Sequence, residues 1–304
     1  MAKSAKIITL TNFQGYGPVF FPKFQVDQMK VDFHIHSNCS DGELEPRDIL
    51  RSAAKVGCEM FSITDHDSIA AYGMLEDDLK GEKPRIVPGC EFSVSWERHE
   101  VHVVGLNFDL GSPKFKSAIT QQNLTRRNRS VAIAQRLETA GVTDILAKAY
   151  SLSGKGPPGR LHFAQALVAK GIVRNIQQAF DRFLGAGQVA FVETSWLSLG
   201  EVCEVVQSAG GSAVLAHPLK YGFSNSKLMK LLEDFGLVGG DALEVISGNQ
   251  NRDNTAHLAR LARKFDFAAS VGSDFHRPNA PWASIGRLPA LPGMCRPIWS
   301  DWLI

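Results

Sequence analysis

The stretch VDFHIHSNCSDG (31–42) sets out the pattern that decides the fold: a short apolar run followed at once by polar, chemically capable residues. Six further segments repeat this pattern, namely MFSITDH (60–66), RIVPGCEFSV (85–94), EVHVVGLNF (100–108), SAVLAHP (212–218), ALEVIS (242–247) and FAASVGSDFH (267–276). Short runs rich in Val, Ile and Phe are typical of parallel strands that are buried on both faces. We therefore expect seven strands.

Amphipathic helical stretches separate most of these segments. Residues 46–56 open with a proline in the first turn and stop at Gly57, and residues 199–209 and 253–265 repeat apolar side chains at helical spacing. Alternating strands and helices predict parallel βα units. Seven strands in this arrangement favour an α/β barrel that lacks one unit over an open sheet.

One interval breaks the alternation. Between Phe108 and Ser212 no segment has a convincing strand pattern, whereas helical patterns cover about 113–140, 143–150, 161–170 and 175–184. A compact domain rarely holds a structureless loop of that length, so we expect an inserted helical subdomain. The predicted organisation is an irregular N-terminal arm (1–29), a barrel (30–112 and 184–304) and an inserted helical cap (113–183).

Composition excludes some classes of protein and indicates another. The 304 residues are 44% hydrophobic and carry a net charge of +2, and no apolar run approaches the roughly 18 residues of a membrane helix. Five scattered cysteines indicate reduced thiols and a cytoplasmic protein. The charge is asymmetric: residues 113–183 hold 12 Lys and Arg against 3 Asp and Glu, hence +9, and the remainder holds 21 against 28, hence −7. This predicts a basic cap over a site for an anionic substrate, with a solvated helix face as the alternative.

Side chains that bind metals follow most of the apolar runs. The set comprises His34, His36, Asp41, His66, Glu91, His102, His217, Asp274 and His276. In a parallel barrel the loops after the strands meet at one rim, where catalytic groups gather. Imidazoles and carboxylates without cysteine favour divalent Mn²⁺, Zn²⁺ or Fe²⁺. A single His-x-His or Asp-His pair is as often structural, so the prediction depends on the combination.

The series DFHIHS, SDG, TDHD, PGCEFS, AHP and SDFH resembles the PHP (polymerase and histidinol phosphatase) family over residues 30 to about 280. The resemblance implies a distorted (β/α)7 barrel with three metal ions at its carboxyl end. By this resemblance the ligand sets are His34, His36, Glu91 and Asp274 for the first ion, Asp41, His66 and His276 for the second, and Glu91, His102 and His217 for the third.

The helical insert narrows the resemblance to one branch of the family. Its Gly159-Arg160-x-His162 motif is similar to that of bacterial nucleoside-3′,5′-bisphosphate phosphatases and of 5′-to-3′ exoribonucleases that trim 5′-monophosphorylated RNA. The implied substrate is a phosphorylated nucleotide or an RNA 5′ end, and the implied metal is Mn²⁺. Nothing in the sequence indicates an obligate protein partner.

The chemistry follows from clustered divalent ions, which make a bridging water acidic and stabilise charge on phosphate oxygens. We expect a metal-bridging hydroxide to attack phosphorus. Asp274 or His276 would accept the proton, and His217 would serve the leaving oxygen. We expect Asp65 and Asp67 to fix histidine tautomers by hydrogen bonds.

Four residues are candidates for substrate binding. Arg160 offers a planar fork suited to phosphate, His162 belongs to the same motif, and Lys220 is a point charge after the AHP segment. Tyr221 would hydrogen-bond to a base or stack on it. Each of these alone is compatible with an ordinary surface position.

Three other functions fit part of the pattern. Another PHP phosphatase, such as a histidinol-phosphate phosphatase, would not need so large a helical insert. A non-catalytic metal-binding scaffold would be expected to have lost ligands, whereas all nine positions carry metal-binding residue types. A metallo-amidohydrolase fits the order of the motifs less well.

Overall fold

The computed structural model describes residues 29–79, 84–278 and 283–302. Its strands form two sheets. The smaller sheet is parallel and has the order β1 (Val31–Asp32), β2 (Met60–Phe61), β3 (Arg85–Ile86). The larger sheet has the order β6 (Leu197–Ser198), β4 (Gly89–Trp96), β5 (His99–Leu106), β7 (Ser212–Leu215), β8 (Ala242–Ser247), β9 (Ala268–Gly272). Except for its last residue, the arm expected at 1–29 lies outside the described residues.

Backbone hydrogen bonds join the edges of the two sheets. On one side Ile35 bridges Phe275, and the amide of Phe33 donates to the carbonyl of Val271 at 3.0 Å. On the other side His66 bridges Glu91. The seven predicted segments therefore run beside one another in one circuit, which is the expected distorted (β/α)7 arrangement.

The direction of one strand differs from the prediction. Strand β5 is antiparallel to both β4 and β7, whereas all strands were expected to be parallel. The reason is the length of the connection, because only Glu97 and Arg98 separate β4 from β5. Two residues close a hairpin but cannot form the crossover that parallel strands need. His102 therefore lies in the first half of β5 and not at the end of a strand.

Helices cover the sheets and supply much of the core. They are α2 (Pro46–Lys55), α3 (Ala70–Met74), α8 (Leu199–Ser208), α9 (Asn225–Leu237) and α10 (Arg252–Lys264), with short 3₁₀ helices η2 (Pro218–Tyr221) and η3 (Ile298–Trp302). The start of α8 shows how local sequence specifies an element, since Ser198 and Glu201 form a reciprocal capping box. No helix in the described part of the chain combines the length and apolarity needed to cross a membrane.

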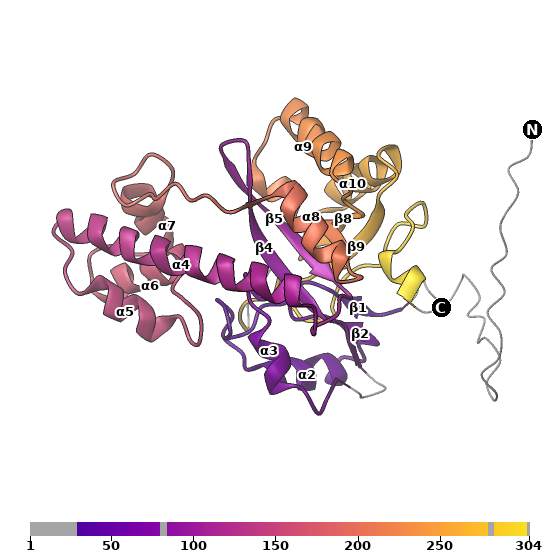
Figure 1. The fold of residues 1–304 in the computed structure, drawn as a ribbon, viewed down its shortest axis with the longest axis horizontal. Coiled ribbons are helices and arrows are strands. Elements are labelled where there is room, and N and C mark those ends of the chain that lie inside the picture. Colours follow the sequence, from indigo (N-terminus) through magenta and orange to yellow (C-terminus); the bar gives the residue numbers. More distant parts are fainter. Residues whose placement is uncertain (1–28, 80–83, 279–282, 303–304) are drawn as a thin grey trace, which may run out of the picture.

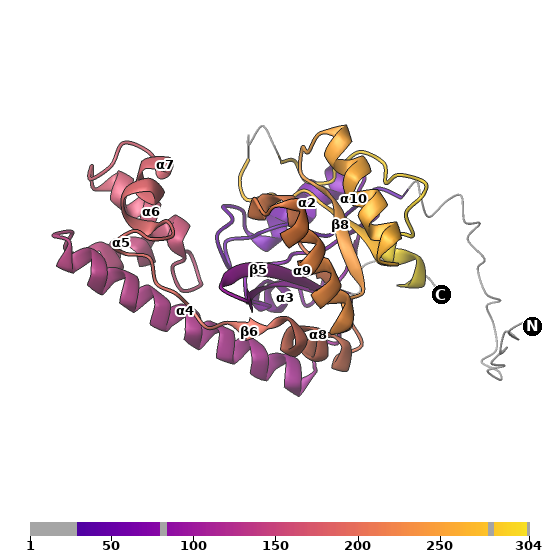
Figure 2. The same ribbon diagram turned by 90° about the horizontal axis from the view of Figure 1, so that it is seen from above.

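The region between β5 and α8 is helical, apart from β6. It contains α4 (Pro113–Thr139), α5 (Ile145–Leu152), α6 (Arg160–Ala169), α7 (Ile176–Ala179) and the π-helical turn η1 (Phe180–Leu184). The long helix α4 runs along the sheet at one end and carries α5–α7 away from it at the other (Figures 1 and 2). Its first turns place Phe115 in the core of the sheets, whereas Ile133 and Leu137 belong to a separate core with α5–α7. The two-residue strand β6 was not expected there; it pairs with the end of β4.

Candidate metal centre

The structure brings all nine predicted ligands together at one rim. His34 and His36 follow β1, Asp41 lies in the next loop, and His66 follows β2. Glu91 and His102 lie on the β4–β5 hairpin, and His217, Asp274 and His276 follow β7 and β9. His102 reaches the rim because β5 runs in the opposite direction, so that its first residues lie where the other strands end.

His34, His36 and Glu91 cluster around one position, and Asp274 lies beside the two histidines. The Nε2 atoms of His34 and His36 are 3.1 Å apart, and each is 3.3 Å from Oε2 of Glu91. Oδ1 of Asp274 lies 3.5 Å from the first nitrogen and 3.4 Å from the second. A tetrahedral ion with bonds of 2.0–2.1 Å separates its ligands by about 3.4 Å. His34, His36 and Glu91 therefore have the mutual spacing that a divalent cation requires, and Asp274 adds an oxygen beside the two imidazoles.

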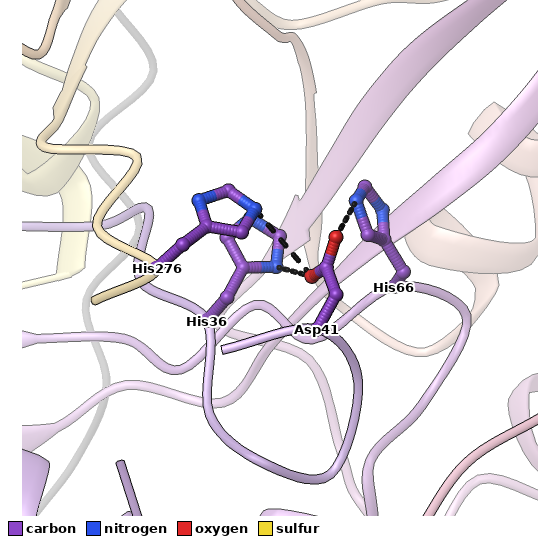
Figure 3. A group of neighbouring side chains, drawn as sticks. All are labelled: His36, Asp41, His66 and His276. Atoms are coloured by element: carbon purple, nitrogen blue, oxygen red, sulfur yellow. Dashed lines mark ion pairs between the residues drawn. The ribbon is translucent and has the colours of Figure 1, made fainter. Parts of the chain in front are cut away.

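A second group lies around Asp41 (Figure 3). Its Oδ1 is 3.5 Å from Nδ1 of His36 and 3.4 Å from Nε2 of His276, and its Oδ2 is 3.7 Å from Nε2 of His66. His36 thus presents one ring nitrogen to each group, whereas it was expected to serve only the first.

Glu91 connects a third group to the others. Its Oε1 lies 2.9 Å from Nδ1 of His102 and 2.9 Å from Nε2 of His217. Its Oε2 is 3.0 Å from Nδ1 of His66, so this ring lies between the second and third groups. Glu91 thus lies beside predicted ligands of all three ions, and its bridging role stays a prediction.

The chemistry of the buried atoms fits divalent cations. His36 Nδ1, His66 Nδ1, Glu91 Oε2 and His217 Nδ1 are buried without a hydrogen-bond partner in the described part of the chain. Burial would raise the pKa of Glu91, but the neighbouring His34, His66 and His102 hold this pKa well below its usual value. Burial lowers the pKa of His66 well below its usual value, which favours the neutral ring that metals bind. A charged carboxylate and unpartnered imidazole nitrogens are what a cation would satisfy.

The partners of Asp65 and Asp67 differ from the prediction. Asp65 accepts hydrogen bonds from Ser37 and Ser40, and Asp67 accepts from Ser93, Gln122 and Arg126. Neither carboxylate hydrogen-bonds to a histidine ring, so the prediction that they fix histidine tautomers was wrong. His66, which lies between them in sequence, contacts the centre, whereas these two carboxylates are bound by Ser37, Ser93 and Arg126.

A cavity of about 190 Å³ separates the metal centre from the helical region. Asp41, His66 and His102 line one side of it. The other side carries Arg126 and Arg129 from α4 and Arg160 and His162 from α6. An anion in this cavity would therefore lie between the predicted ligands and several fixed cations.

Arg160 and His162, which were predicted to bind substrate, both line this cavity. The Arg160 side chain is 30% exposed, and its Nη2 donates to Oε1 of Glu100 at 3.3 Å. His162 is buried, and its Nδ1 accepts from the amide of Gly159 at 3.0 Å. This bond assigns the proton of the neutral ring to Nε2, which is then a donor.

Lys220 and Tyr221 lie beside the centre but do not line the cavity. Lys220 donates to Oδ2 of Asp274. The Tyr221 hydroxyl accepts from the amide of His102 at 2.8 Å and donates to the carbonyl of Ala216 at 2.9 Å. Its ring packs against His217. These contacts give Tyr221 a role in holding two ligand-bearing strands.

Several residues of the site were missed. Arg126 is bound to Asp67 and Arg129 to Glu100, and both guanidinium groups stack on Trp196 at 5.3 and 5.2 Å from the ring centroid. The run Thr-Arg-Arg-Asn-Arg (125–129) was counted only as part of the basic charge, although its spacing places two arginines on one face of a helix.

A histidine- and carboxylate-rich centre at the rim of an α/β barrel, facing a basic cavity, defines a metal-dependent hydrolase. The chain belongs to the PHP family: the model of the PHP domain matches residues 32–184. It is 38% identical over 270 residues to a 5′-3′ exoribonuclease of Haemophilus influenzae, covering 89% of this chain and 98% of the relative. It is 34% identical over 275 residues to a 3′,5′-nucleoside bisphosphate phosphatase of Chromobacterium violaceum, covering 89% and 95%. A solved structure of an amidohydrolase from Chromobacterium violaceum, with bound sulfate and no metal, superimposes with a TM-score of 0.82 and 33% identity, covering 90% and 95%.

Proposed function

We propose that this protein is a metal-dependent phosphoesterase that hydrolyses nucleoside 3′,5′-bisphosphates and trims 5′-monophosphorylated RNA or short oligonucleotides in the 5′-to-3′ direction. The observation that supports this most is the cavity, which has His66 and His102 of the metal centre on one side and Arg126 and Arg160 on the other. A terminal phosphate and a scissile phosphoester need these two environments next to each other. The names of the relatives from Haemophilus influenzae and Chromobacterium violaceum point to the same two substrates.

The proposed cofactor is a set of three divalent ions, with Mn²⁺ favoured over Zn²⁺ and Fe²⁺. They would be held by the first group (His34, His36, Glu91, Asp274), the second (Asp41, His66, His276) and the third (Glu91, His102, His217). When bound, such ions polarise a phosphoryl group and supply a nucleophile at neutral pH. The chain's own part is to hold these ring nitrogens and carboxylate oxygens close together at the rim.

We assign the handling of protons to Asp274, His276 and His217. Nδ1 of His276 lies 3.0 Å from the carbonyl of Asp274, which directs the lone pair of Nε2 toward Asp41. Lys220 contacts Oδ2 of Asp274, whereas His34 and His36 face its Oδ1. His217, on the Ala-His-Pro loop, is the residue that we assign to the leaving oxygen.

Substrate binding is assigned to the cap, residues 113–183, with Arg160 and His162 as its principal contacts. Both an arginine fork and an Nε2–H group donate to phosphate oxygens. The amide of Gly159 fixes the His162 ring, so no rotation is needed when the anion arrives.

All five cysteines are free, which supports the proposed cytoplasmic location.

The test is an assay of Mn²⁺-loaded protein with 3′,5′-adenosine bisphosphate, a short 5′-phosphorylated RNA and histidinol phosphate in parallel. We expect phosphate or nucleotide release from the first two substrates. Release from histidinol phosphate alone would replace the proposal with the other phosphatase activity. No release from any of them, with metal bound, would favour the non-catalytic scaffold.

The assignment of Arg160 has its own test. Arg160→Ala should raise KM strongly while metal content stays unchanged, whereas His66→Ala should lose metal. Arg127→Ala is the matched control because Arg127 is an exposed arginine of the same basic region that does not line the cavity. Loss of metal in the Arg160 variant, or an equal rise of KM in the Arg127 variant, would contradict the assigned role.

A further inference from the structure

Glu244 is a buried carboxylate that the sequence analysis did not single out. It lies in the middle of β8, in the apolar run ALEVIS, and is only 2% exposed. A charge in this position is costly unless it is paired. Its partners are both at the metal centre, and this makes Glu244 a candidate for a role in organising the site.

Its two oxygens hold residues from two different ligand groups. Oε1 and Oε2 each lie 3.2 Å from Nδ1 of His34, and Oε2 accepts from the backbone amide of His217 at 2.6 Å. His34 belongs to the first group and His217 to the third. One carboxylate therefore contacts both.

The local backbone is built around this contact. The pairing of β8 with β9 shifts register between Glu244 and Ile246, which is a bulge of the kind that re-aims side chains. A Cβ atom at Gly272 of β9 would lie 2.1 Å from Cβ of His34 and 2.8 Å from Oε1 of Glu244. His217 has a φ of 28°, a conformation that a non-glycine residue holds only when its surroundings impose it. Gly272 leaves room for the contact between His34 and Glu244. Glu244 in turn accepts a hydrogen bond from the backbone amide of the strained residue, His217.

We propose that Glu244 is a positioning residue that fixes the first and third ligand groups relative to each other; this rests on the proposed metal-dependent function. By accepting from Nδ1–H of His34, it leaves Nε2 of that ring unprotonated and directed at Glu91, Asp274 and His36. By accepting from the His217 amide, it fixes the loop that directs Nε2 of His217 at Glu91. Carboxylates behind metal-bound histidines act in this way in other sites, where their loss costs 10- to 100-fold in metal affinity.

Two substitutions separate the two contacts. In Glu244→Gln the single amide oxygen still accepts from the His217 amide, so the amide nitrogen faces Nδ1 of His34. This reverses the tautomer of His34 and places a proton on Nε2. Glu244→Ala removes both contacts. We expect Glu244→Gln to weaken the binding of the ion held by the first group. We expect Glu244→Ala to weaken the binding of the ions held by the first and the third group.

The experiment is a Zn²⁺ titration of ¹⁵N-histidine-labelled protein, with long-range ¹H–¹⁵N spectra that report tautomer and ligation ring by ring. In wild type, Zn²⁺-loaded His34 should carry its proton on Nδ1. Glu244→Gln should weaken ligation at His34 by 10- to 100-fold and leave His276 of the second group unchanged, and Glu244→Ala should weaken His217 as well.

Asp32→Asn is the matched control. Asp32 is also fully buried and accepts from the backbone amides of Ser273 and Gly286 at 2.8 Å and of His34 at 3.4 Å, but in the described part of the chain it makes no hydrogen bond to the His34 ring. It should lower stability without changing the tautomer of His34. Three results would overturn the proposal. The wild-type His34 ring could carry its proton on Nε2, Glu244→Gln could leave ligation at His34 unchanged, or Asp32→Asn could lose ligation at His34 to the same extent as Glu244→Gln. The wild-type spectrum tests it even if the variants do not fold. Because no substrate is used, a protein that passes this test but hydrolyses nothing would refute the proposed function alone.

Discussion

Replacing Arg126 by alanine should leave the buried carboxylate of Asp67 without a countercharge. The Arg126 side chain is 14% exposed, and its Nε donates to Oδ2 of Asp67 at 2.5 Å. Asp67 is fully buried, and its other acceptor contacts are with the amide of Ser93 and the side-chain amide of Gln122, both at 2.9 Å. The variant leaves the carboxylate with two neutral donors and no cation.

The magnitude follows from this set of contacts. Removing one partner of a buried ion pair costs about 3–5 kcal/mol, because the remaining charge is uncompensated. The two amide donors that stay on Asp67 place the expected loss near the lower end, at about 3 kcal/mol in the free energy of unfolding. In Asp67→Asn/Arg126→Ala no charge is stranded, so the double variant should be more stable than Arg126→Ala alone.

The measurement is urea unfolding followed by circular dichroism at a fixed metal concentration, with Arg127→Ala as the exposed control. The control should change the unfolding free energy by less than about 0.5 kcal/mol. A loss below about 1 kcal/mol in Arg126→Ala would refute the reasoning, since such values are typical of exposed pairs. So would a double variant whose loss equals the sum of the single losses, because the two residues would then be uncoupled.

Three further predictions concern the centre. Gly272→Ala should cost about 1–3 kcal/mol and lower metal content, since the new methyl group displaces His34; full metal content in a stable variant would contradict the close contact. Tyr221→Phe leaves the His102 amide without its acceptor and should lower the free energy of unfolding by about 1–3 kcal/mol. Tyr150→Phe, at an exposed tyrosine, should leave stability unchanged, and equal thermal midpoints for the two variants would argue against the positioning role of Tyr221. Removal of divalent ions with EDTA should abolish phosphoester hydrolysis and lower the thermal midpoint, and Mn²⁺ at 100 times its Kd should restore about 2.7 kcal/mol of stability per ion bound. An unchanged midpoint would show that the native state does not bind the metal.

The strands and the ligand positions could be predicted because both are local properties of the sequence. An apolar run ending in His or Asp places its polar residue at the end of a strand, and the segments around His34, His66 and Asp274 follow that rule. The direction of β5 was missed although it was readable: the predicted segments ended at Val94 and began at Glu100, which leaves no room for a crossover. His102 was selected as a residue at the end of a strand, whereas it lies in the first half of β5, and its metal-binding role stays a prediction.

The residues that support the ligands could not be predicted, because their partners are remote in sequence. Asp65 and Asp67 adjoin His66 in the chain, yet their side chains turn toward Ser37 and Arg126. The carboxylate that does hold a ligand ring, Glu244, comes from a strand more than 200 residues further on. The only sequence signal was a glutamate inside an otherwise apolar run, which indicates a buried charge but not its partner.

The positive charge of the cap shows how far composition can be taken. The surplus of +9 in residues 113–183 was interpreted as charge available to a substrate. The structure shows that part of it has partners on the barrel, since Arg126 is bound to Asp67 and both Arg129 and Arg160 are bound to Glu100. Glu100 is itself at the cavity; burial would raise the pKa of its carboxyl, but a hydrogen bond with His102 and then the charges of Arg129 and Arg160 hold this pKa well below its usual value. The same arginines therefore attach the cap to the barrel and face the cavity, so an incoming phosphate must compete with Glu100 for Arg129 and Arg160. Charge counting predicts the sign of the ligand, but only the pairing shows which cations are free to bind it.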